Sequence, residues 1–142
     1  MDDSRLNDGP DRTIFESIPQ STEQIATEIV DAAFRVHTNL GPGLLESVYE
    51  VCLCYELSQR KLSFERQLSL PVVYGGVSID AGLRIDLLVA DCVIVELKAV
   101  EKLLPVHEAQ VLTYLKLTEK RVGLLINFNV VRIKDGIRRL AR

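Results

Sequence analysis

Three charged residues stand inside two short apolar runs, and they constrain the fold of this chain more than any other feature. Asp86 lies in the run at residues 83–89, and Glu96 and Lys98 lie in the run Val93–Lys98. Both runs are rich in Leu, Ile and Val, so they predict neighbouring strands. Hiding an unpaired charge among such residues costs several kcal/mol, so these side chains need partners.

Strand geometry decides whether the three charges meet. Side chains two residues apart share one face of a strand. We therefore expect Glu96 and Lys98 to project together, and Val95 and Leu97 to enter the opposite layer. A three-residue loop at residues 90–92 would place Asp86 opposite Glu96, with Cβ atoms about 4.5–5.5 Å apart. A slip of one residue would turn Asp86 to the other face.

Two carboxylates at that separation repel each other unless a cation lies between them. Hard divalent ions such as Mg²⁺ bind a few carboxylate or carbonyl oxygens and keep several waters, so Asp86, Glu96 and the backbone carbonyl of Leu97 could supply a partial shell. Lys98 would orient or activate a water, or neutralise a transition state. A salt-bridged trio on an exposed hairpin explains the same residues, and both interpretations stay open.

Composition predicts one ordinary globular domain. The chain has 142 residues, of which 47% are hydrophobic and 26% charged. We expect a flexible tail at residues 1–20 and a single domain at 21–142. No apolar run approaches the roughly 18 residues that span a membrane, and residues 1–5 are acidic and polar, so we expect a cytoplasmic protein with no membrane partner. The three cysteines include no CxxC pair, which favours reduced core residues over a zinc site.

The charge is distributed unevenly along the chain. The net charge is −3, but residues 116–142 carry eight Lys or Arg against two Asp or Glu. Such a segment can make a basic surface on an acidic protein, and it can equally be a solvated face.

Hydrophobic periodicity predicts helices and strands that alternate along the domain. We expect a helix from Ser21, with Ser21 and Gln24 as a capping box, broken at residues 41–43. A second helix at about 44–60 should bury the stripe Leu44, Leu45, Val48, Val51, Cys52 and Tyr55. Expected strands lie at 63–74, 77–81, 83–89, 93–98 and 122–128, with a helix at 106–118 and a last hairpin of 130–133 with 137–140. This order predicts an α/β domain with a central sheet flanked by helices.

Asp86 and the run Glu96-Leu97-Lys98 resemble the signature of the PD-(D/E)XK nuclease superfamily, which is an Asp on one strand and Glu-x-Lys on the next. The run Gly43-Leu44-Leu45-Glu46-Ser47-Val48-Tyr49 is similar to the motif of the small bacterial GxxExxY proteins, which are assigned to this superfamily. The likeness covers roughly residues 22–140. It implies an α/β (α+β) fold with a restriction-endonuclease-like core, in which a central mixed β-sheet is flanked by helices.

The resemblance also implies roles for residues outside the two strands. It suggests that Glu46 completes the metal shell, although a carboxylate there would also suit the helix dipole. Gln110 and Tyr114 match a QxxxY pattern of exonuclease-like branches and share one helical face; a polar edge beside a core tyrosine is the alternative. Tyr114, Tyr49 and His37 are candidates for positions next to a substrate, and a structural role is open for each.

The sequence therefore supports a Mg²⁺- or Mn²⁺-dependent nuclease that hydrolyses phosphodiester bonds of DNA or RNA with a metal-activated water. Asp86, Glu96, Lys98 and Gln110 would form its catalytic set, Glu46 and Leu97 would join the metal shell, and the basic C-terminal segment would grip the nucleic-acid backbone. The alternative is a catalytically silent binding or assembly module with the same fold, acting as a homo-oligomer or with a protein partner. A small-molecule or nucleotide hydrolase is a third possibility.

Overall fold

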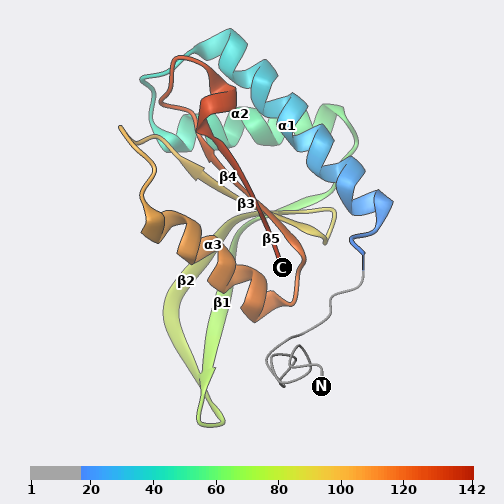
Figure 1. Ribbon diagram of the computed structural model, residues 1–142, viewed down its shortest axis with the longest axis vertical. Coiled ribbons are helices and arrows are strands. Elements are labelled where there is room, and N and C mark those ends of the chain that lie inside the picture. Colours follow the sequence, from blue (N-terminus) through green and yellow to red (C-terminus); the bar gives the residue numbers. More distant parts are fainter. Residues whose placement is uncertain (1–16) are drawn as a thin grey trace, which may run out of the picture.

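A five-stranded mixed sheet separates two helical layers in the computed structural model, which describes residues 17–142 (Figure 1). Helices α1 and α2 cover one face of the sheet, and α3 covers the other. The predicted central mixed sheet flanked by helices is thus confirmed. The helices are α1 (Gln20–Leu40), α2 (Glu46–Gln59) and α3 (Pro105–Thr118), and the strands are β1 (Phe64–Tyr74), β2 (Val77–Val89), β3 (Val93–Lys98), β4 (Val122–Asn127) and β5 (Ile137–Ala141).

The strands follow one another across the sheet in chain order. β1, β2 and β3 form antiparallel pairs, β3 and β4 are parallel, and β4 and β5 are antiparallel. The parallel pair requires a crossover, which α3 provides. Because β3 and β4 end at the same edge of the sheet, the residues that follow both strands lie close together there.

The core forms on both faces of the central strands. Val93, Val95 and Leu97 pack with α1 and α2, whereas Ile94 packs with Tyr114 and other residues of α3. This alternation agrees with the expectation that Val95 and Leu97 enter the layer opposite to the face of Glu96 and Lys98. Burial on both faces explains why β3 and β4 have nearly continuous apolar sequences.

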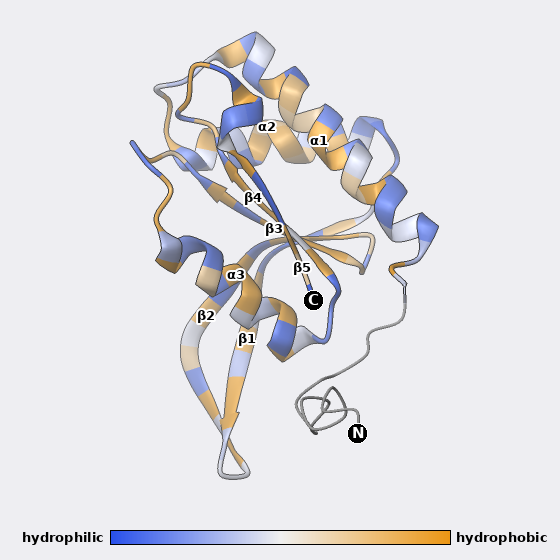
Figure 2. Cartoon of the chain, viewed as in Figure 1, coloured by the Kyte–Doolittle hydropathy of each residue, from blue (hydrophilic) through white to orange (hydrophobic). Residues whose placement is uncertain are grey.

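Helix α2 buries a different face from the one that the sequence predicts. The expected stripe is largely exposed: Leu45 is 74% exposed, and Leu44, Val48, Val51 and Tyr55 are exposed as well. The buried face instead carries Tyr49, Glu50, Leu53, Cys54 and Leu57. Hydrophobic residues occur around much of this helix (Figure 2), so two stripes of helical spacing compete and only packing against β3 and α1 selects one.

Leu53→Ala and Leu45→Ala form a matched pair that measures this choice of face. Leu53 is fully buried in the cluster beneath α1 and α2. We expect Leu53→Ala to lower the free energy of unfolding by about 2–5 kcal/mol, because it leaves a cavity. Leu45→Ala should change it by less than about 0.5 kcal/mol, since that side chain is mostly in solvent. Urea denaturation of both variants checks this, and equal losses would contradict the assigned faces.

Several expected boundaries also differ. Helix α1 begins at Gln20 after Pro19 and has no side-chain cap, so the Ser21 capping box is wrong. Residues 77–89 form one continuous strand rather than two, because their pairing with β1 runs along its length. No strand forms at 130–133; β5 pairs with β4 instead of closing a terminal hairpin.

The expected tail at 1–20 lies mostly outside the described residues. In the part of the chain that the structure describes, no helix is both long and apolar enough to cross a membrane.

Candidate functional site

The β2–β3 hairpin has the loop and register that the site requires. Ala90 and Asp91 adopt φ values of 50° and 56°, and Cys92 N–H donates to the Val89 carbonyl at 3.0 Å. Val89 then pairs with Val93 across the hairpin. The predicted three-residue loop is confirmed, and the same register, continued along the strands, sets Asp86 against Glu96.

Counted from the loop, backbone pairing between β2 and β3 ends at Leu87 and Val95. At the next pair of positions, Asp86 and Glu96, hydrogen bonds from backbone to side chain replace it. The backbone N–H of Asp86 donates to Glu96 Oε1 at 2.9 Å, and the N–H of Leu97 donates to Asp86 Oδ2 at 2.8 Å. Each carboxylate therefore satisfies a backbone donor that the opening strands would leave unpaired. These reciprocal bonds fix both carboxylates on adjacent strands.

The two carboxylates lie in an environment that opposes their ionisation. Glu96 is only 4% exposed, and burial followed by repulsion from Asp86 raises its pKa from 4.5 to about 8. Burial is also the main cause that raises the pKa of Asp86. The Lys98 charge acts on both carboxyls in the opposite direction. The site thus disfavours ionisation of both carboxyls, and the charge of Lys98 only partly offsets this effect.

Glu46 opens helix α2 and faces the same charges. Partial burial raises its pKa first, Asp86 and Glu50 raise it further, and Lys98 lowers it. Glu46 is consequently within electrostatic range of the strand carboxylates, as the sequence predicts.

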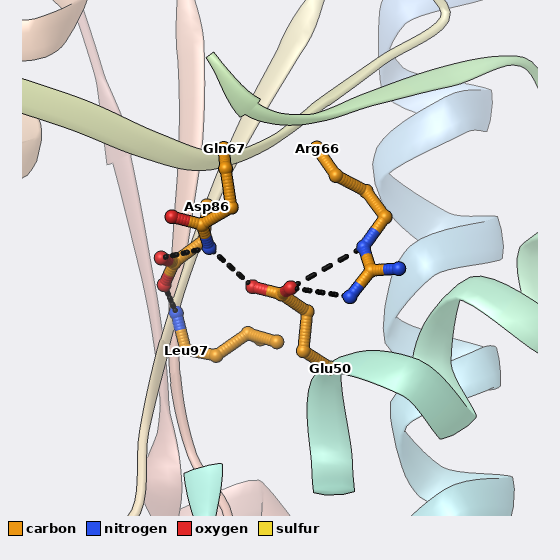
Figure 3. A network of polar contacts seen from close by, with 5 residues as sticks. All are labelled: Glu50, Arg66, Gln67, Asp86 and Leu97. Atoms are coloured by element: carbon orange, nitrogen blue, oxygen red, sulfur yellow. Dashed lines mark hydrogen bonds and ion pairs between the residues drawn. The ribbon is translucent and has the colours of Figure 1, made fainter. Parts of the chain in front are cut away.

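Glu50, Arg66 and Gln67 join the site without having been predicted (Figure 3). Glu50 is buried one turn after Glu46, and Arg66 binds its Oε2 at 2.9 Å through Nη2 and at 3.3 Å through Nε. Gln67 Nε2 donates to Glu50 Oε1 at 2.8 Å and to Asp86 Oδ1 at 3.3 Å. The spacing of Glu46 and Glu50, four residues apart on one helical face, is the sequence signal that could have revealed this group.

The segment after β3 is fastened to the end of β4. Lys98 pairs with Asn127 across the parallel strands, and the Lys98 carbonyl accepts a hydrogen bond from Phe128 N–H at 2.9 Å. The Asn127 side chain donates to the Val100 carbonyl at 2.9 Å and accepts from Val100 N–H at 3.0 Å. Gly136 packs so closely on the Asn127 carbonyl that a Cβ would collide with it. These contacts fix the backbone that carries Lys98.

Helix α3 approaches the carboxylates from the other layer. Burial, followed by the charges of Glu96 and Asp86, raises the pKa of Tyr114, and a hydrogen bond with Gln110 counteracts part of the rise. Tyr114 is buried, while Gln110 is half-buried. The structure therefore brings Gln110 and Tyr114 together on the side of the site that α3 covers.

Tyr49 and His37 are placed in the core instead of at a substrate surface. Tyr49 is fully buried, stacks on Phe128 at 4.6 Å between ring centroids, and donates to the Gly41 carbonyl at 2.7 Å. Its hydroxyl also accepts from Leu44 N–H at 3.1 Å. His37 is buried with Nε2 2.7 Å from the Val130 carbonyl. Tyr49 holds the loop before α2 through these bonds, which is a structural role; its position next to a substrate stays a prediction.

A family model described as the PD-(D/E)XK nuclease superfamily matches residues 23–140. The chain belongs to this superfamily. The match extends from α1 through β5, so it includes every PD-(D/E)XK position described above. No curated protein and no solved structure matched the chain. The predicted superfamily is confirmed, and its nuclease character indicates a nucleic-acid substrate.

PD-(D/E)XK nucleases generally use divalent metal ions. Within residues 17–142, no three His, Cys, Asp or Glu side chains gather into a ready metal-binding cluster, so Glu46 is not joined to Asp86 and Glu96 in one closed set. The donor chemistry nevertheless fits such an ion, because Mg²⁺ and Mn²⁺ favour carboxylate and carbonyl oxygens. Burial and mutual proximity oppose ionisation of Asp86 and Glu96, and a divalent cation would favour their ionised forms.

Proposed function

We propose that this chain is a Mg²⁺- or Mn²⁺-dependent nuclease of the GxxExxY group that hydrolyses phosphodiester bonds in DNA or RNA. The observation that carries the proposal is the reciprocal pairing of Asp86 and Glu96 where β2 and β3 separate. Two desolvated, adjacent carboxylates destabilise a fold unless a proton or a cation compensates them, so their presence points to cation binding. Superfamily membership supports the same function.

In this proposal, Asp86, Glu96 and the Leu97 carbonyl hold the ion, and Glu46 adds negative charge from the start of α2. When bound, the ion supplies an acidified water and neutralises charge on the phosphate. The protein's part is to fix the donors before the substrate arrives. Backbone bonds to both carboxylates provide that preorganisation.

Lys98 is the proposed catalytic cation. It lies on the same strand as Glu96, with its backbone fixed by β4, and its charge already acts on Glu46, Asp86 and Glu96. A cation there orients a water or stabilises charge that develops on the phosphate. Gln110, half-buried beside Tyr114, is the proposed polar contact from α3.

Arg132 and Lys134 are the proposed contacts to the nucleic-acid backbone. Pairing of Ile126 with Ile137 sets residues 132–136 beside the end of β4, the edge where β3 also ends. Arg139 and Lys120 are held more closely, by Glu23 at 2.9 Å and by Asp91 at 3.2 Å, whereas Arg132 makes only a longer, exposed ion pair with Asp135 at 3.7 Å. The basic surface proposed to contact the nucleic-acid backbone is therefore local, and it carries less charge than residues 116–142 as a whole.

A cleavage assay with a matched lysine pair tests the function. Purified protein is incubated with single-stranded DNA, double-stranded DNA, single-stranded RNA and hairpin RNA, each with Mg²⁺, with Mn²⁺ and with EDTA. We expect cleavage of at least one substrate with metal only, its loss in Lys98→Met, and its retention in Lys102→Met, whose side chain is exposed. No cleavage of any substrate, or equal cleavage by both variants, contradicts the proposal.

An assembly role is the second candidate, favoured by the exposed apolar stripe on α2. Val51, Cys52 and Tyr55 line a hollow of about 350 Å³ together with residues of α1. Contiguous apolar surface of this kind is typical of association sites. Analytical sedimentation of wild type and of Tyr55→Asp measures the oligomeric state. A wild-type dimer that becomes a monomer in the variant supports the assembly role, and a wild-type monomer contradicts it.

A further inference from the structure

We propose that Gln67 is a positioning residue that orients the Asp86 carboxylate from strand β1. The inference rests on the proposed nuclease function and adds a member to its site. Two independent observations carry it: the backbone conformation of Gln67 and the two carboxylates that its amide contacts.

The backbone of Gln67 adopts a conformation that glutamine disfavours. Its φ is 51°, in the left-handed region, although its neighbours Arg66 and Leu68 pair regularly with Leu87 and Ile85. This register places Gln67 across from Asp86. Glycine would adopt such a φ without strain, whereas a residue with a Cβ is disfavoured there. Such a conformation persists where the surrounding structure holds the residue, as strand pairing on both sides and the contacts of the side chain do here.

The amide of Gln67 supplies that interaction. Its Nε2 has two protons, and it donates to Glu50 Oε1 at 2.8 Å and to Asp86 Oδ1 at 3.3 Å. Hydrogen bonds to ionised acceptors are stronger than bonds between neutral groups. The left-handed turn of the backbone thus directs one neutral donor at two anions on different elements, α2 and β2 (Figure 3).

Glu50 is a fixed anchor for this contact. Arg66 holds its other oxygen at 2.9 Å, and the Glu50 side chain is only 10% exposed, so it has little freedom to move. Asp86 is in turn bonded through Oδ2 to Leu97 N–H at 2.8 Å. Gln67 and Leu97 therefore hold separate oxygens of Asp86, which restricts rotation of the carboxylate.

The residue type suits a site that takes a cation. A lysine or arginine at position 67 would place a positive charge against Asp86 and compete with a divalent ion. The amide of Gln67 orients the carboxylate without neutralising it. Each oxygen of Asp86 accepts one of these bonds and keeps acceptor capacity for a further partner.

Three variants separate the side chain from the backbone. Gln67→Gly removes the amide and permits the same φ, Gln67→Ala removes the amide and keeps the strain, and Ser69→Gly is the control two residues along β1. Hydrogen exchange of the Leu97 amide reports the position of Asp86 directly. We expect the Leu97 amide to exchange roughly tenfold faster in both Gln67 variants than in wild type, and at the wild-type rate in Ser69→Gly. The exchange rate of the Leu124 amide in β4 should be unchanged in all three variants.

Kinetics and metal binding give the functional readout. For both Gln67 variants we expect kcat and Mn²⁺ affinity to fall about 10–100-fold, as for other residues that orient a metal ligand. KM should change little, because Gln67 acts through Asp86. Gln67→Gly should melt at or above the temperature of Gln67→Ala, since glycine relieves the strain.

Failure of this inference is distinguishable from failure of the nuclease proposal. Unchanged exchange at Leu97 in Gln67→Gly overturns the positioning role, even if wild type cleaves nucleic acid. Wild type that neither cleaves nor binds Mn²⁺ overturns the function, while the Leu97 exchange still decides whether Gln67 holds Asp86.

Discussion

Asp86→Asn is expected to lower metal-dependent cleavage by about 10³-fold or more. Asparagine preserves the size of the side chain and one carbonyl acceptor for Leu97 N–H. It removes the negative charge that would bind a divalent ion. The fold should therefore persist while ion binding and catalysis fail, which circular dichroism and a cleavage assay measure together.

Asp91→Asn is the matched control for that experiment. Asp91 makes the turn of the same hairpin, its side chain is exposed, and its φ of 56° is one that asparagine also tolerates. Cleavage should stay within about twofold of wild type, as for most surface changes away from a site. Equal activity of Asp86→Asn and wild type would remove the carboxylate from the mechanism.

Glu96→Gln is expected to change stability in opposite directions with and without metal. Without metal, the folded-state pKa of Glu96 is about 8, above the ordinary 4.5. The folded state therefore binds this proton more tightly than the unfolded state. The stabilisation that comes from holding this proton on Glu96 is complete below pH 4.5 and is lost as the pH rises through about 8. Glutamine has no proton to lose, so Glu96→Gln in EDTA should be the more stable protein at pH 9, by a few kcal/mol.

Mn²⁺ should reverse that order. An ion that binds only the folded state stabilises it, and wild type offers two strand carboxylates where the variant offers one. Thermal melts at pH 5, 7 and 9, with EDTA and with Mn²⁺, measure both effects. Glu101→Gln, at an exposed position beyond β3, should behave as wild type throughout. A variant that is less stable than wild type at pH 9 in EDTA would contradict the proposed cause.

The local part of the site follows from the sequence. Alternation along β3 separates the Glu96 face from the face of its neighbours, and a short loop at 90–92 sets the register that opposes Asp86 to Glu96. These properties depend on residues within about one hairpin, where side-chain period and turn length leave few choices. The same holds for α3, which begins at Pro105 as a first-turn proline favours.

Contacts between distant segments were not predictable in the same way. The spacing of Glu46 and Glu50 indicates a shared helical face, but it does not indicate that Arg66 and Gln67 bind Glu50, because that pairing depends on how α2 packs on the sheet. The buried face of α2 has the same origin: Leu53 is covered and Val51 is not, although both lie in apolar stripes of helical spacing. Propensity and periodicity do not distinguish such faces when hydrophobic residues surround a helix.

The sequence by itself determined the residue types of the Asp86, Glu96 and Lys98 trio and their place on neighbouring strands. It made their register depend on one condition, a three-residue loop at 90–92, because strand pairing over a short loop is a local property. The tertiary structure alone decided which groups surround that trio. It brings Glu50 and Gln67 to Asp86, sets Tyr114 near Glu96, and withdraws Tyr49 into the core. The reason is that burial and charge interaction depend on distances between elements, which the order of residues along one chain does not specify.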